Sequence, residues 1–468
     1  MLKIRILILV LLLFSCGCSG IPRHALVGHL PSKELEPFKK NEKILILAPH
    51  PDDEAIACAG IIQKALAAGA RVKIVYLTNG DHNELAFIVY EKRLTIRTGE
   101  FIHLGKVRQA EATRAMEFLG LSEKDLVFLG YPDYGTFEIF CKYWQPGKPF
   151  RDRLTRISKV PYKDNPSYGA EYIGQNILED LKEQLLDYRP DRIFVSHPAD
   201  VNVDHKTYYL FLQVALSDLE GIIPRPKVYP YLVHCVGWPK PRHYHPELEL
   251  YPPEKFTDSG FNWLRSDLSP EELDKKHRAI LFYRSQTQTS AFYLLAFARK
   301  NEFFGSFPGL RLKAQPASAD RDIVYSVSSA MFRELEYPEY PEQPGITAHE
   351  GFARYAVTDD YFVVRLDKPR RSRGRFKVLF YVFGYRQGTP FSQMPKIRIF
   401  TKGRSCKVFN GKELLPGHGV QVNFDRKYLI LKIPLTLLGR PDYVLTALKS
   451  YHGSMPEDVT AFRKIEIK

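Results

Sequence analysis

The stretch Ala48-Pro-His-Pro-Asp-Asp-Glu54 follows directly on the apolar run Lys43-Ile-Leu-Ile-Leu-Ala48. An unbroken apolar run of this length is typical of a strand that is buried on both faces of a parallel sheet. Residues 54–68, rich in Ala and Ile and followed by Gly69, predict a helix, and 71–77 predict a second buried strand. A strand, a helix and a strand at this spacing form a βαβ unit, so the two strands should be parallel.

The same alternation continues along the chain. Further helices are predicted at 107–119, 171–188, 205–219 and 269–283, and further strands at 125–129, 192–196 and 227–236. Residues 137–167 have no clear period and predict a long insertion over the functional face, while 290–303 closes the domain. The fold class predicted for residues 43–305 is therefore α/β, a Rossmann-like, mostly parallel sheet with flanking helices.

The C-terminal part of the chain has a different pattern. Short strand-like runs occur at 361–366, 376–382, 396–400, 428–433 and 443–447. Turn residues separate them at the spacing that is typical of a β-sandwich. We therefore expect residues 306–344, rich in Pro, Ser and Glu, to be a linker, and 345–468 to form a C-terminal β-sandwich.

The first twenty residues predict export. Lys3 and Arg5 precede an apolar run that is too short to span a bilayer, as in a signal segment. Leu13-Phe-Ser-Cys16 resembles a bacterial lipobox, and Cys18 is a second candidate for the lipid-bearing cysteine. An ordinary secretory signal or an uncleaved anchor is the alternative. We expect an exported protein of the bacterial cell envelope, lipid-anchored to a membrane, with 21–42 as a polar tether.

Composition argues against two classes of protein, those that bind nucleic acid and those built on a disulfide framework. The 468 residues carry a formal net charge of +14, which fits an anionic lipid, an acidic glycan or a nucleic acid as partner. The positive charges are scattered, with one dense run at 368–375 that reads as a solvated loop, and no nucleic-acid motif is present, so we expect no nucleic-acid partner. The four cysteines beyond residue 20 are far apart and do not predict a disulfide framework.

The polar turn after the first strand offers an imidazole, His50, and three carboxylates, Asp52, Asp53 and Glu54. In open α/β sheets, ligands bind at the carboxyl ends of the strands, where this turn lies. Three carboxylates cannot lie close together in a buried crevice without a cation or a proton between them. Imidazole combined with carboxylate suits zinc.

A second polar cluster, His197-Pro-Ala-Asp-Val-Asn-Val-Asp-His205, follows the predicted strand 192–196. Both clusters should face one crevice, because the carboxyl ends of parallel strands lie at the same edge. One His and one Asp from the first cluster with one His from the second leave a coordination position open for water, as in a catalytic zinc site. An acidic run before a helix also fits N-capping, but two such clusters at two strand ends favour a metal site.

His50-Pro-Asp-Asp-Glu54 resembles the hallmark motif of the PIG-L/LmbE family of zinc-dependent deacetylases, and the resemblance covers about residues 43–305. Further matching stretches are Leu77-Thr-Asn-Gly80, Arg108-Gln-Ala-Glu111, Tyr131-Pro-Asp133, Ser285-Gln286 and Asn301-Glu-Phe303. Members of this family remove acetyl from N-acetylglucosaminyl phosphatidylinositol, from mycothiol and bacillithiol precursors and from some antibiotics. The resemblance implies an N-deacetylase whose substrate is an N-acetylated amino sugar in a glycan or glycoconjugate.

The resemblance also implies roles for individual residues. It assigns one Zn²⁺ per chain to His50, Asp53 and His205, with other divalent metals left open, and makes Asp52 the general base that takes the proton of the attacking zinc-bound water.

It assigns Arg108 and Asp133 to substrate binding, although a surface salt bridge is the alternative for Arg108, and we expect Asp200 to bind substrate as well. It makes Glu54 and Asp204 supports behind the metal ligands and the catalytic groups.

The proton donor for the leaving amine is where this chain departs from the family. Many relatives have Asp-x-His-x-Asp-His, whereas this chain has Asn202 at the position of the extra His. Asn can donate a hydrogen bond to an oxyanion but cannot shuttle a proton. His234 or His197 is then the expected substitute, and a structural histidine at a strand end is the alternative for His234.

Three functions stay open at this point. The leading one is the zinc-dependent N-deacetylase; the others are metal-dependent hydrolysis of another amide or a phosphoester, and a non-enzymatic glycan-binding lipoprotein. The segments 433–439, 443–448 and 460–465 are loosely similar to carbohydrate-binding sandwiches of the family-nine type, and a purely structural accessory domain is the alternative. Nucleotide binding is disfavoured because no Gly-rich loop follows the first strand.

Overall fold

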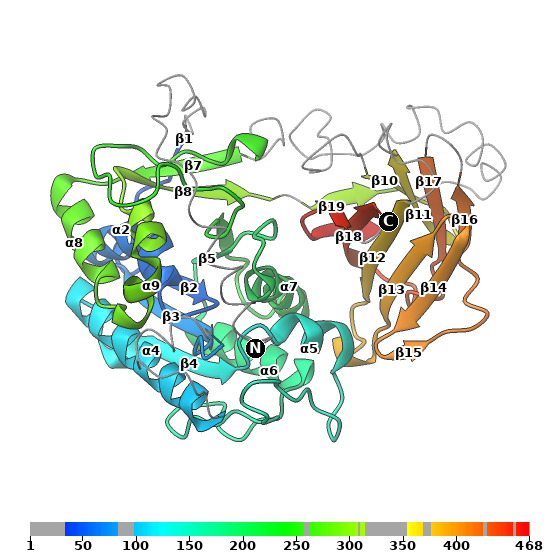
Figure 1. Ribbon diagram of the computed structural model, residues 1–468, viewed down its shortest axis with the longest axis horizontal. Coiled ribbons are helices and arrows are strands. Elements are labelled where there is room, and N and C mark those ends of the chain that lie inside the picture. The colour runs from blue at the N-terminus through cyan, green and yellow to red at the C-terminus, as the bar shows by residue number, and fades with distance from the viewer. Residues whose placement is uncertain are drawn as a thin grey trace, which may run out of the picture.

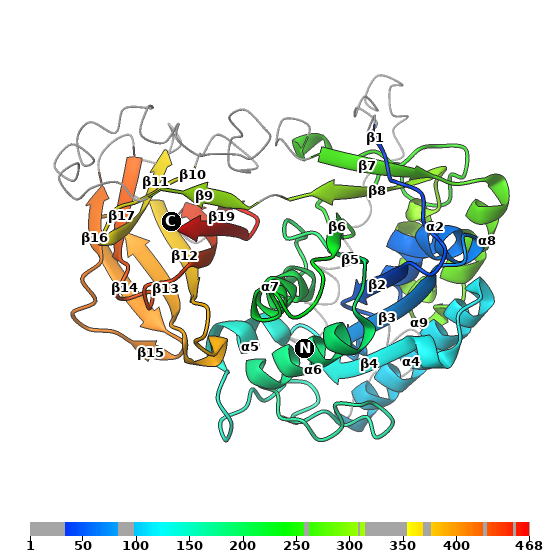
Figure 2. The same ribbon diagram turned by 180° about the vertical axis from the view of Figure 1, so that it is seen from behind.

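The structure, a computed structural model, describes residues 33–82, 98–256, 262–307, 309–313, 353–367, 376–424, 428–452 and 455–467. The expected export segment with Cys16 and Cys18, and the basic run 368–375, lie outside these residues. The described chain forms an α/β domain and a β-sandwich that lie side by side (Figure 1; Figure 2). Within the described residues, no helix is both long and apolar enough to cross a membrane.

A five-stranded parallel sheet forms the centre of the first domain. Its strands are β2 (Lys43–Ala48), β3 (Arg71–Thr78), β4 (Leu126–Tyr131), β5 (Arg192–Ser196) and β6 (Lys227–Tyr231), in the order β4-β3-β2-β5-β6. The predicted Rossmann-like sheet is confirmed. The chain leaves β2 toward β3 on one side and later returns to pair β5 on the other, so β2 and β5 flank the point where the strand order reverses, the preferred ligand position in such sheets.

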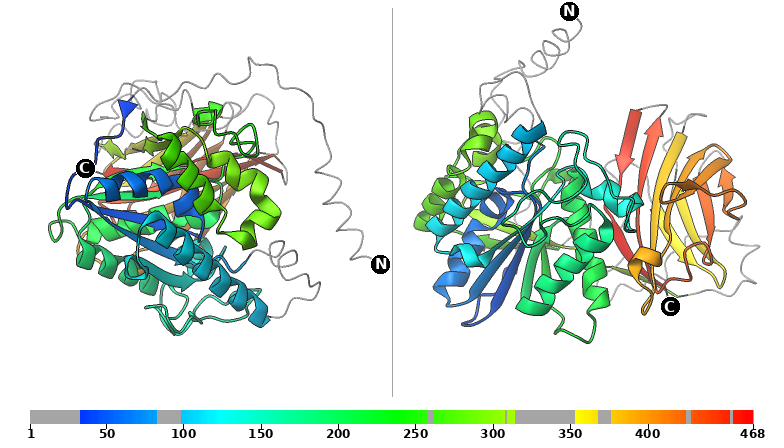
Figure 3. Two further views of the ribbon diagram at one scale, coloured as in Figure 1. Left: turned by 90° about the vertical axis from the view of Figure 1, so that its left-hand side faces the viewer. Right: turned by 90° about the horizontal axis from the view of Figure 1, so that it is seen from below.

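Helices cover both faces of this sheet (Figure 3). Packed against one another on one face are α2 (Asp53–Ala67), α4 (Thr98–Leu119), α8 (Pro270–Ile280) and α9 (Arg284–Leu294); on the other are α5 (Thr136–Lys142), α6 (Gly174–Tyr188) and α7 (Val203–Asp218). Helix α4 begins nine residues before the predicted 107. The reason is tertiary packing, since Phe101 and Leu104 in this first part are buried despite the two glycines beside them.

A small second sheet differs from the predicted organisation. It consists of β1 (Lys33–Glu34), β7 (Asn262–Asp267) and β8 (Asn301–Ser306). The described part of the expected tether, 33–42, lies against the domain, because Arg192 donates hydrogen bonds to the Glu36 and Pro37 carbonyls at 2.7 and 2.8 Å and to Glu42 at 2.7 Å.

The C-terminal domain has two sheets that enclose an apolar core. One sheet has the order β10 (Ala353–Val357), β11 (Tyr361–Asp367), β17 (Tyr428–Pro434) and β16 (Gln421–Phe424). The other has the order β15 (Glu413–Leu414), β14 (Ser405–Asn410), β13 (Lys396–Lys402), β12 (Phe376–Tyr385), β18 (Tyr443–His452), β20 (Arg463–Ile467) and β9 (Leu310–Leu312), with β19 (Met455–Val459) paired to β18. Side chains of both sheets form one buried cluster, as expected of a sandwich, and β9 adds a strand from the range expected to be linker.

The two domains share an aromatic interface at α5. The Phe140 ring lies 5.3 Å from the Phe383 ring, and Trp144 lies 4.9 Å from Phe391. The buried ammonium of Lys396 lies 4.6 Å from the Trp144 ring and donates to the Met394 carbonyl at 2.7 Å. The apolar core of the first domain therefore continues into the sandwich, which holds α5 in place from outside.

Candidate metal centre and its surroundings

The turn between β2 and α2 presents the first two candidate ligands. Asp53 begins α2, and its Oδ2 accepts a hydrogen bond from the backbone N–H of His50 at 2.9 Å, which closes the turn. Asp52, the N-cap residue, has a φ of 132°, a conformation that L-residues rarely adopt. Strained backbone of this kind is concentrated at functional sites, where the surrounding structure has to enforce it.

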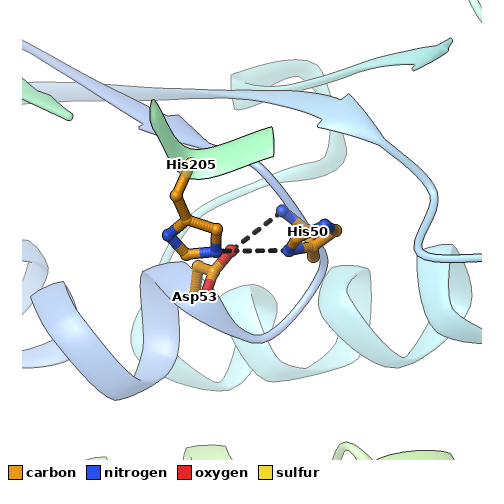
Figure 4. Close-up of side chains that lie close together, drawn as sticks. All are labelled: His50, Asp53 and His205. Carbon is orange, nitrogen blue, oxygen red and sulfur yellow. Dashed lines mark hydrogen bonds and ion pairs between the residues drawn. The ribbon is translucent and has the colours of Figure 1, made fainter. Parts of the chain in front are cut away.

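The third candidate ligand, His205, lies in the first turn of α7, after β5. Its Nε2 lies 3.1 Å from Oδ2 of Asp53, and Nδ1 of His50 lies 3.3 Å from the same oxygen. The three side chains point toward one another (Figure 4), and one ligand atom from each lies within 4.8 Å of the others. The two clusters predicted from the sequence therefore meet at one place, at the switch point of the sheet.

The outer nitrogens of the two histidines each contact carboxylates. Nε2 of His50 lies 3.0 Å from Oδ1 of Asp133 and 3.3 Å from Oδ2 of Asp204, and Nδ1 of His205 lies 3.3 Å from Oδ2 of Asp200. A carboxylate on the outer nitrogen is the usual support of a metal-bound imidazole, because it fixes the ring and makes the inner nitrogen more basic. Two other groups of side chains have metal-ligand spacing, His50–Asp133–Asp204 and Asp200–His205–His234. We interpret their carboxylates as supports of the histidines.

The charges of the site fit a cation. Burial would raise the pKa of Asp53, but the two imidazoles lower it below its ordinary value. Burial opposes protonation of His205, yet Asp200 and Asp53 raise its pKa to about 9. Without a cation these imidazoles take up protons to balance the carboxylates. A divalent metal ion between Asp53 and the two inner nitrogens supplies the same balance, so the donor set fits such an ion.

Asp52 lies beside this centre and is paired with Arg108. The Arg108 Nη2 donates to Oδ2 of Asp52 at 3.1 Å and to the Pro51 carbonyl at 2.8 Å, and Nη1 donates to the Gly80 carbonyl at 2.8 Å. Burial raises the pKa of Asp52 to about 6, although Arg108 opposes the shift. Arg108 is buried, so the alternative of a surface salt bridge is wrong. Its guanidinium holds Asp52 and the turn in place, a role that the prediction of substrate binding did not include.

Asp200 and Asp204 are both completely buried behind the histidines. Asp200 accepts hydrogen bonds from the backbone N–H groups of Val233 and His234 at 3.1 and 2.8 Å, so the structure gives it a supporting position and not the predicted substrate-binding one. Asp204 accepts from the Tyr134 N–H at 2.6 Å and from the Thr136 hydroxyl, which fits the support expected of it.

Glu54 is a support of a different kind. It accepts from the Tyr283 hydroxyl and, at 3.1 Å, from the Asp52 N–H. Burial raises its pKa to about 8, so it is protonated at neutral pH and adds no negative charge to the centre.

His234 and Asn202 line the pocket above the centre. Nδ1 of His234 lies 3.3 Å from Oδ1 of Asp200, and its ring lies 4.5 Å from the His205 ring. Asn202 caps α7, because its side-chain oxygen accepts from the Asp204 N–H at 2.8 Å, which leaves its amide nitrogen as the group able to donate.

His197 lies outside the pocket. Its ring is fully buried and stacks on Trp263 at 5.6 Å, and burial lowers its pKa to about 3. The expectation that it could serve as the proton donor is therefore wrong, because a neutral, buried imidazole cannot reach a substrate.

The pocket has a volume of about 220 Å³ and brings in residues that the sequence did not single out. The lining residues are His50, Asp52, Asp53, Ile56, His82, Arg108, Asp133, Tyr134, Asn202, His234, Gln286, Ser290, Tyr293 and Leu294. His82 follows the end of β3 and Tyr134 directly follows Asp133, so their positions after strands were the available signals. Ser290 and Tyr293 reach the pocket only through the packing of α9.

Two of the matching stretches serve packing. Glu111 accepts from the Ser285 N–H at 2.9 Å, which links α4 to α9. Glu302 accepts from the Gly60 N–H and from the buried Lys276 ammonium, both at 2.8 Å, which links β8 to α2 and α8.

Comparison with known proteins agrees with this site. Residues 45–216 match the PIG-L family, described as GlcNAc-PI de-N-acetylase. The similarity to this family covers less than half of the chain. The matched range contains all of His50, Asp52, Asp53 and His205, whereas β6, α8, α9 and the sandwich lie outside it.

A curated relative of the chain is diacetylchitobiose deacetylase of Thermococcus kodakarensis, which is 33% identical over 99 residues, 21% of this chain and 33% of the relative, so the match spans about a third of that protein. A conserved protein of Thermus thermophilus is 21% identical, with a TM-score of 0.32, over 54% of this chain and 84% of its own. The N,N'-diacetylchitobiose deacetylase of Pyrococcus horikoshii is 19% identical, with a TM-score of 0.32, over 53% and 72%.

Proposed function

We propose that this protein is a zinc-dependent N-deacetylase that hydrolyses the acetamide of an N-acetylated amino sugar in a glycan or glycoconjugate. The observation that carries the proposal is the arrangement of His50, Asp53 and His205 around one point, with a carboxylate on the outer nitrogen of each histidine. The similarity to the PIG-L family and the deacetylase among the chain's relatives support the same activity.

His50, Asp53 and His205 would hold one zinc ion. When bound there, the ion would lower the pKa of a water molecule and polarise the acetyl carbonyl. Asp52 is the general base. Its pKa of about 6 leaves it ionised near neutral pH but basic enough to accept a proton, and Arg108 fixes its orientation toward the pocket.

The proton for the leaving amine would come from His234. Asp200 holds its Nδ1, which leaves Nε2 as the nitrogen that can exchange a proton with a group in the pocket. Asn202 would donate a hydrogen bond to the oxygen that becomes negative as the tetrahedral intermediate forms. Proton transfer would thereby fall to His234 alone, and Asn202 would supply only the hydrogen bond to the oxyanion.

The test is acetate release from a panel of N-acetylglucosamine-containing substrates by the purified full-length protein, with zinc, with a chelator and with Asp52→Ala. Metal-dependent acetate release that disappears in Asp52→Ala supports the proposal. A protein with two bound metal ions per chain and phosphoesterase activity would support the phosphoester alternative. A protein that binds no divalent metal would sink the catalytic proposal.

We further propose, from the sequence alone, that the chain is exported and lipid-anchored at Cys16, or at Cys18. Growth with a labelled fatty acid should label the protein. Cys16→Ala should abolish the label if Cys16 is the site, and Cys18→Ala if Cys18 is; a protein that stays unlabelled in its native host would contradict the anchor.

A further inference from the structure

A cavity of about 500 Å³ lies between the two domains, next to the metal pocket. From the α/β domain its lining residues are Phe137, Pro198, Ala199, Asp200, Val201, Val203, Lys206 and Phe256; from the sandwich they are Tyr381, Ala447, Leu448, Lys449, Val459, Thr460, Ala461 and Phe462. This set is called the interdomain groove below. It has the size and the mainly apolar, partly aromatic lining of small-molecule sites.

The groove and the metal pocket share two segments of chain. Tyr134 lines the metal pocket and Phe137, one helical turn later, lines the groove. Asn202 lines the metal pocket while its neighbours Val201 and Val203 line the groove. Tyr134 and Val201 are 55% and 46% exposed, unusually high for such side chains, so the ridge between the two hollows is itself an exposed apolar surface.

Two lysines, Lys206 on α7 and Lys449 on β18, supply the positive charge of the groove. Among the side chains that the structure describes, which do not include those of 452–458, neither ammonium has a carboxylate at ion-pair distance, and Lys449 approaches the Tyr451 ring at 5.4 Å. Asp200 is the one carboxylate of the lining, and its oxygens already contact His205, His234 and two backbone N–H groups. The described part of the groove lining therefore offers two cations from opposite walls and no free anion.

We propose that the interdomain groove binds an acidic sugar unit of the same glycan whose N-acetylated unit enters the metal pocket. Lys206 and Lys449 would pair with its carboxylate, and the aromatic pair of Phe137 and Tyr381, whose rings pack edge to face with centroids 5.4 Å apart, would contact the apolar face of the sugar ring. The chain's net charge of +14 favours an acidic polymer in the same way. The placement of the N-acetylated unit in the metal pocket rests on the proposed function. The binding of the acidic unit to the groove does not.

Binding is measured by calorimetry with the full-length Asp52→Asn protein, which should bind without turnover. The probes are a tetrasaccharide of alternating glucuronate and N-acetylglucosamine, and the uncharged N-acetylglucosamine tetramer. We expect the acidic probe to bind about tenfold more tightly at low salt, with a preference that fades near 0.5 M salt, as expected for partly exposed ion pairs. Equal affinity for the two probes at low salt would overturn the proposal.

Lys449→Met should reduce that tenfold preference to about twofold, since it removes the charge but keeps most of the stem. Lys407→Met is the matched control, an exposed lysine on β14 that is absent from the groove lining, and should keep the preference. Lys206→Met should act like Lys449→Met, provided that bound metal equals that of the parent protein, because Lys206 adjoins His205. An unchanged preference in Lys449→Met, or an uncharged alkyl glucoside that displaces the acidic probe equally well, would contradict the assignment.

The two proposals can fail separately. Acetate release from neutral and acidic substrates at equal kcat/KM would leave the deacetylase and remove the groove site. Preferential binding of the acidic probe without acetate release from any substrate would leave the groove site and remove the deacetylase.

Discussion

The two domains bury polar groups in opposite ways. In the α/β domain, seven imidazole and carboxylate side chains around the metal centre are less than 9% exposed, namely His50, Asp53, Glu54, Asp133, Asp200, Asp204 and His205. In the described residues of the sandwich, no carboxylate or imidazole is buried to that degree, and the core between the sheets is apolar.

The difference separates groups kept for function from groups kept for stability. Burying an ionised carboxylate costs several kcal/mol unless a counter-charge compensates it, so a fold has no stability reason to collect so many in one place. The apolar core between the two sheets of the sandwich shows the packing that serves stability. We therefore expect substitutions at the metal centre to change activity more than stability, and substitutions at the aromatic interface to do the reverse.

The largest effect on activity is expected for Asp52→Asn. Loss of a general base costs about 10²–10⁴-fold in kcat. The free energy of unfolding should stay equal or rise, because the substitution removes one negative charge from a buried, strained turn. The measurement is kcat for acetate release together with urea denaturation.

Asp180→Asn is the matched control for Asp52→Asn. Asp180 accepts from the Tyr131 hydroxyl at 2.6 Å and the Ser167 hydroxyl at 2.5 Å, and it is absent from the lining of the metal pocket. It should keep kcat and lose about 1–3 kcal/mol of stability. A drop in kcat of similar size in both variants would show that Asp52 acts through folding and not through chemistry.

The next effect is on stability, at the interface. Phe391→Ala removes a buried ring that contacts Phe140 and Trp144, and large-to-small substitutions of this kind cost about 3–5 kcal/mol. All three tryptophans belong to the α/β domain, and Trp144 also contacts Phe391, so their fluorescence follows the unfolding of that domain and of its interface with the sandwich. We expect its midpoint to fall although the mutated ring belongs to the sandwich.

Phe409→Ala, at a half-buried ring on β14, is the control for that coupling. It should leave the tryptophan transition nearly unchanged. If Phe391→Ala left it unchanged as well, the shared core would not couple the two domains.

The parallel sheet could be predicted because its signals are local. The apolar run 43–48 and the glycine after α2 need no partner to be recognised, and both histidine clusters follow strands. Strands β1 and β9 could not be predicted, since strands of two or three residues pair with segments far away in the chain. The early start of α4 depends on burial of Phe101, which tertiary packing decides.

In the site, residue identity predicted the metal ligands but not the partners of the other charges. His50, Asp53 and His205 carry a recognisable spacing. Arg108, by contrast, reaches Asp52 only because α4 packs over the turn, and Asp200 lies behind His205 because of how the loop before α7 folds back. Such contacts arise from packing between elements and leave no trace in local sequence.

A smaller effect is expected for Asp204→Asn, which weakens the carboxylate behind His50. Loss of such a support typically costs about 10–100-fold in metal affinity or activity. The measurement is zinc affinity by competition with a chelator, and Asp218→Asn, at the other end of α7, is the control. Unchanged zinc affinity in Asp204→Asn would mean that Asp133 alone supports the His50 ring.

The smallest effect is the pH dependence of stability through His197. Its folded-state pKa is about 3, below the ordinary 6.5, so the unfolded chain binds this proton first as the pH falls. The stability contribution is complete above pH 6.5 and is lost as the pH falls toward 3, at about 1.4 kcal/mol per pH unit.

His197→Asn removes that proton while its side-chain oxygen can still accept from the Ala199 N–H, which now donates to Nδ1 at 3.1 Å. Because the ring also stacks on Trp263, the variant should be less stable at pH 7. Between pH 6.5 and 5.5, however, the unmutated protein should lose about 1 kcal/mol more than the variant, measured by urea denaturation. Parallel losses in the two proteins would show that His197 is protonated in the folded state and is not a neutral part of the buried core.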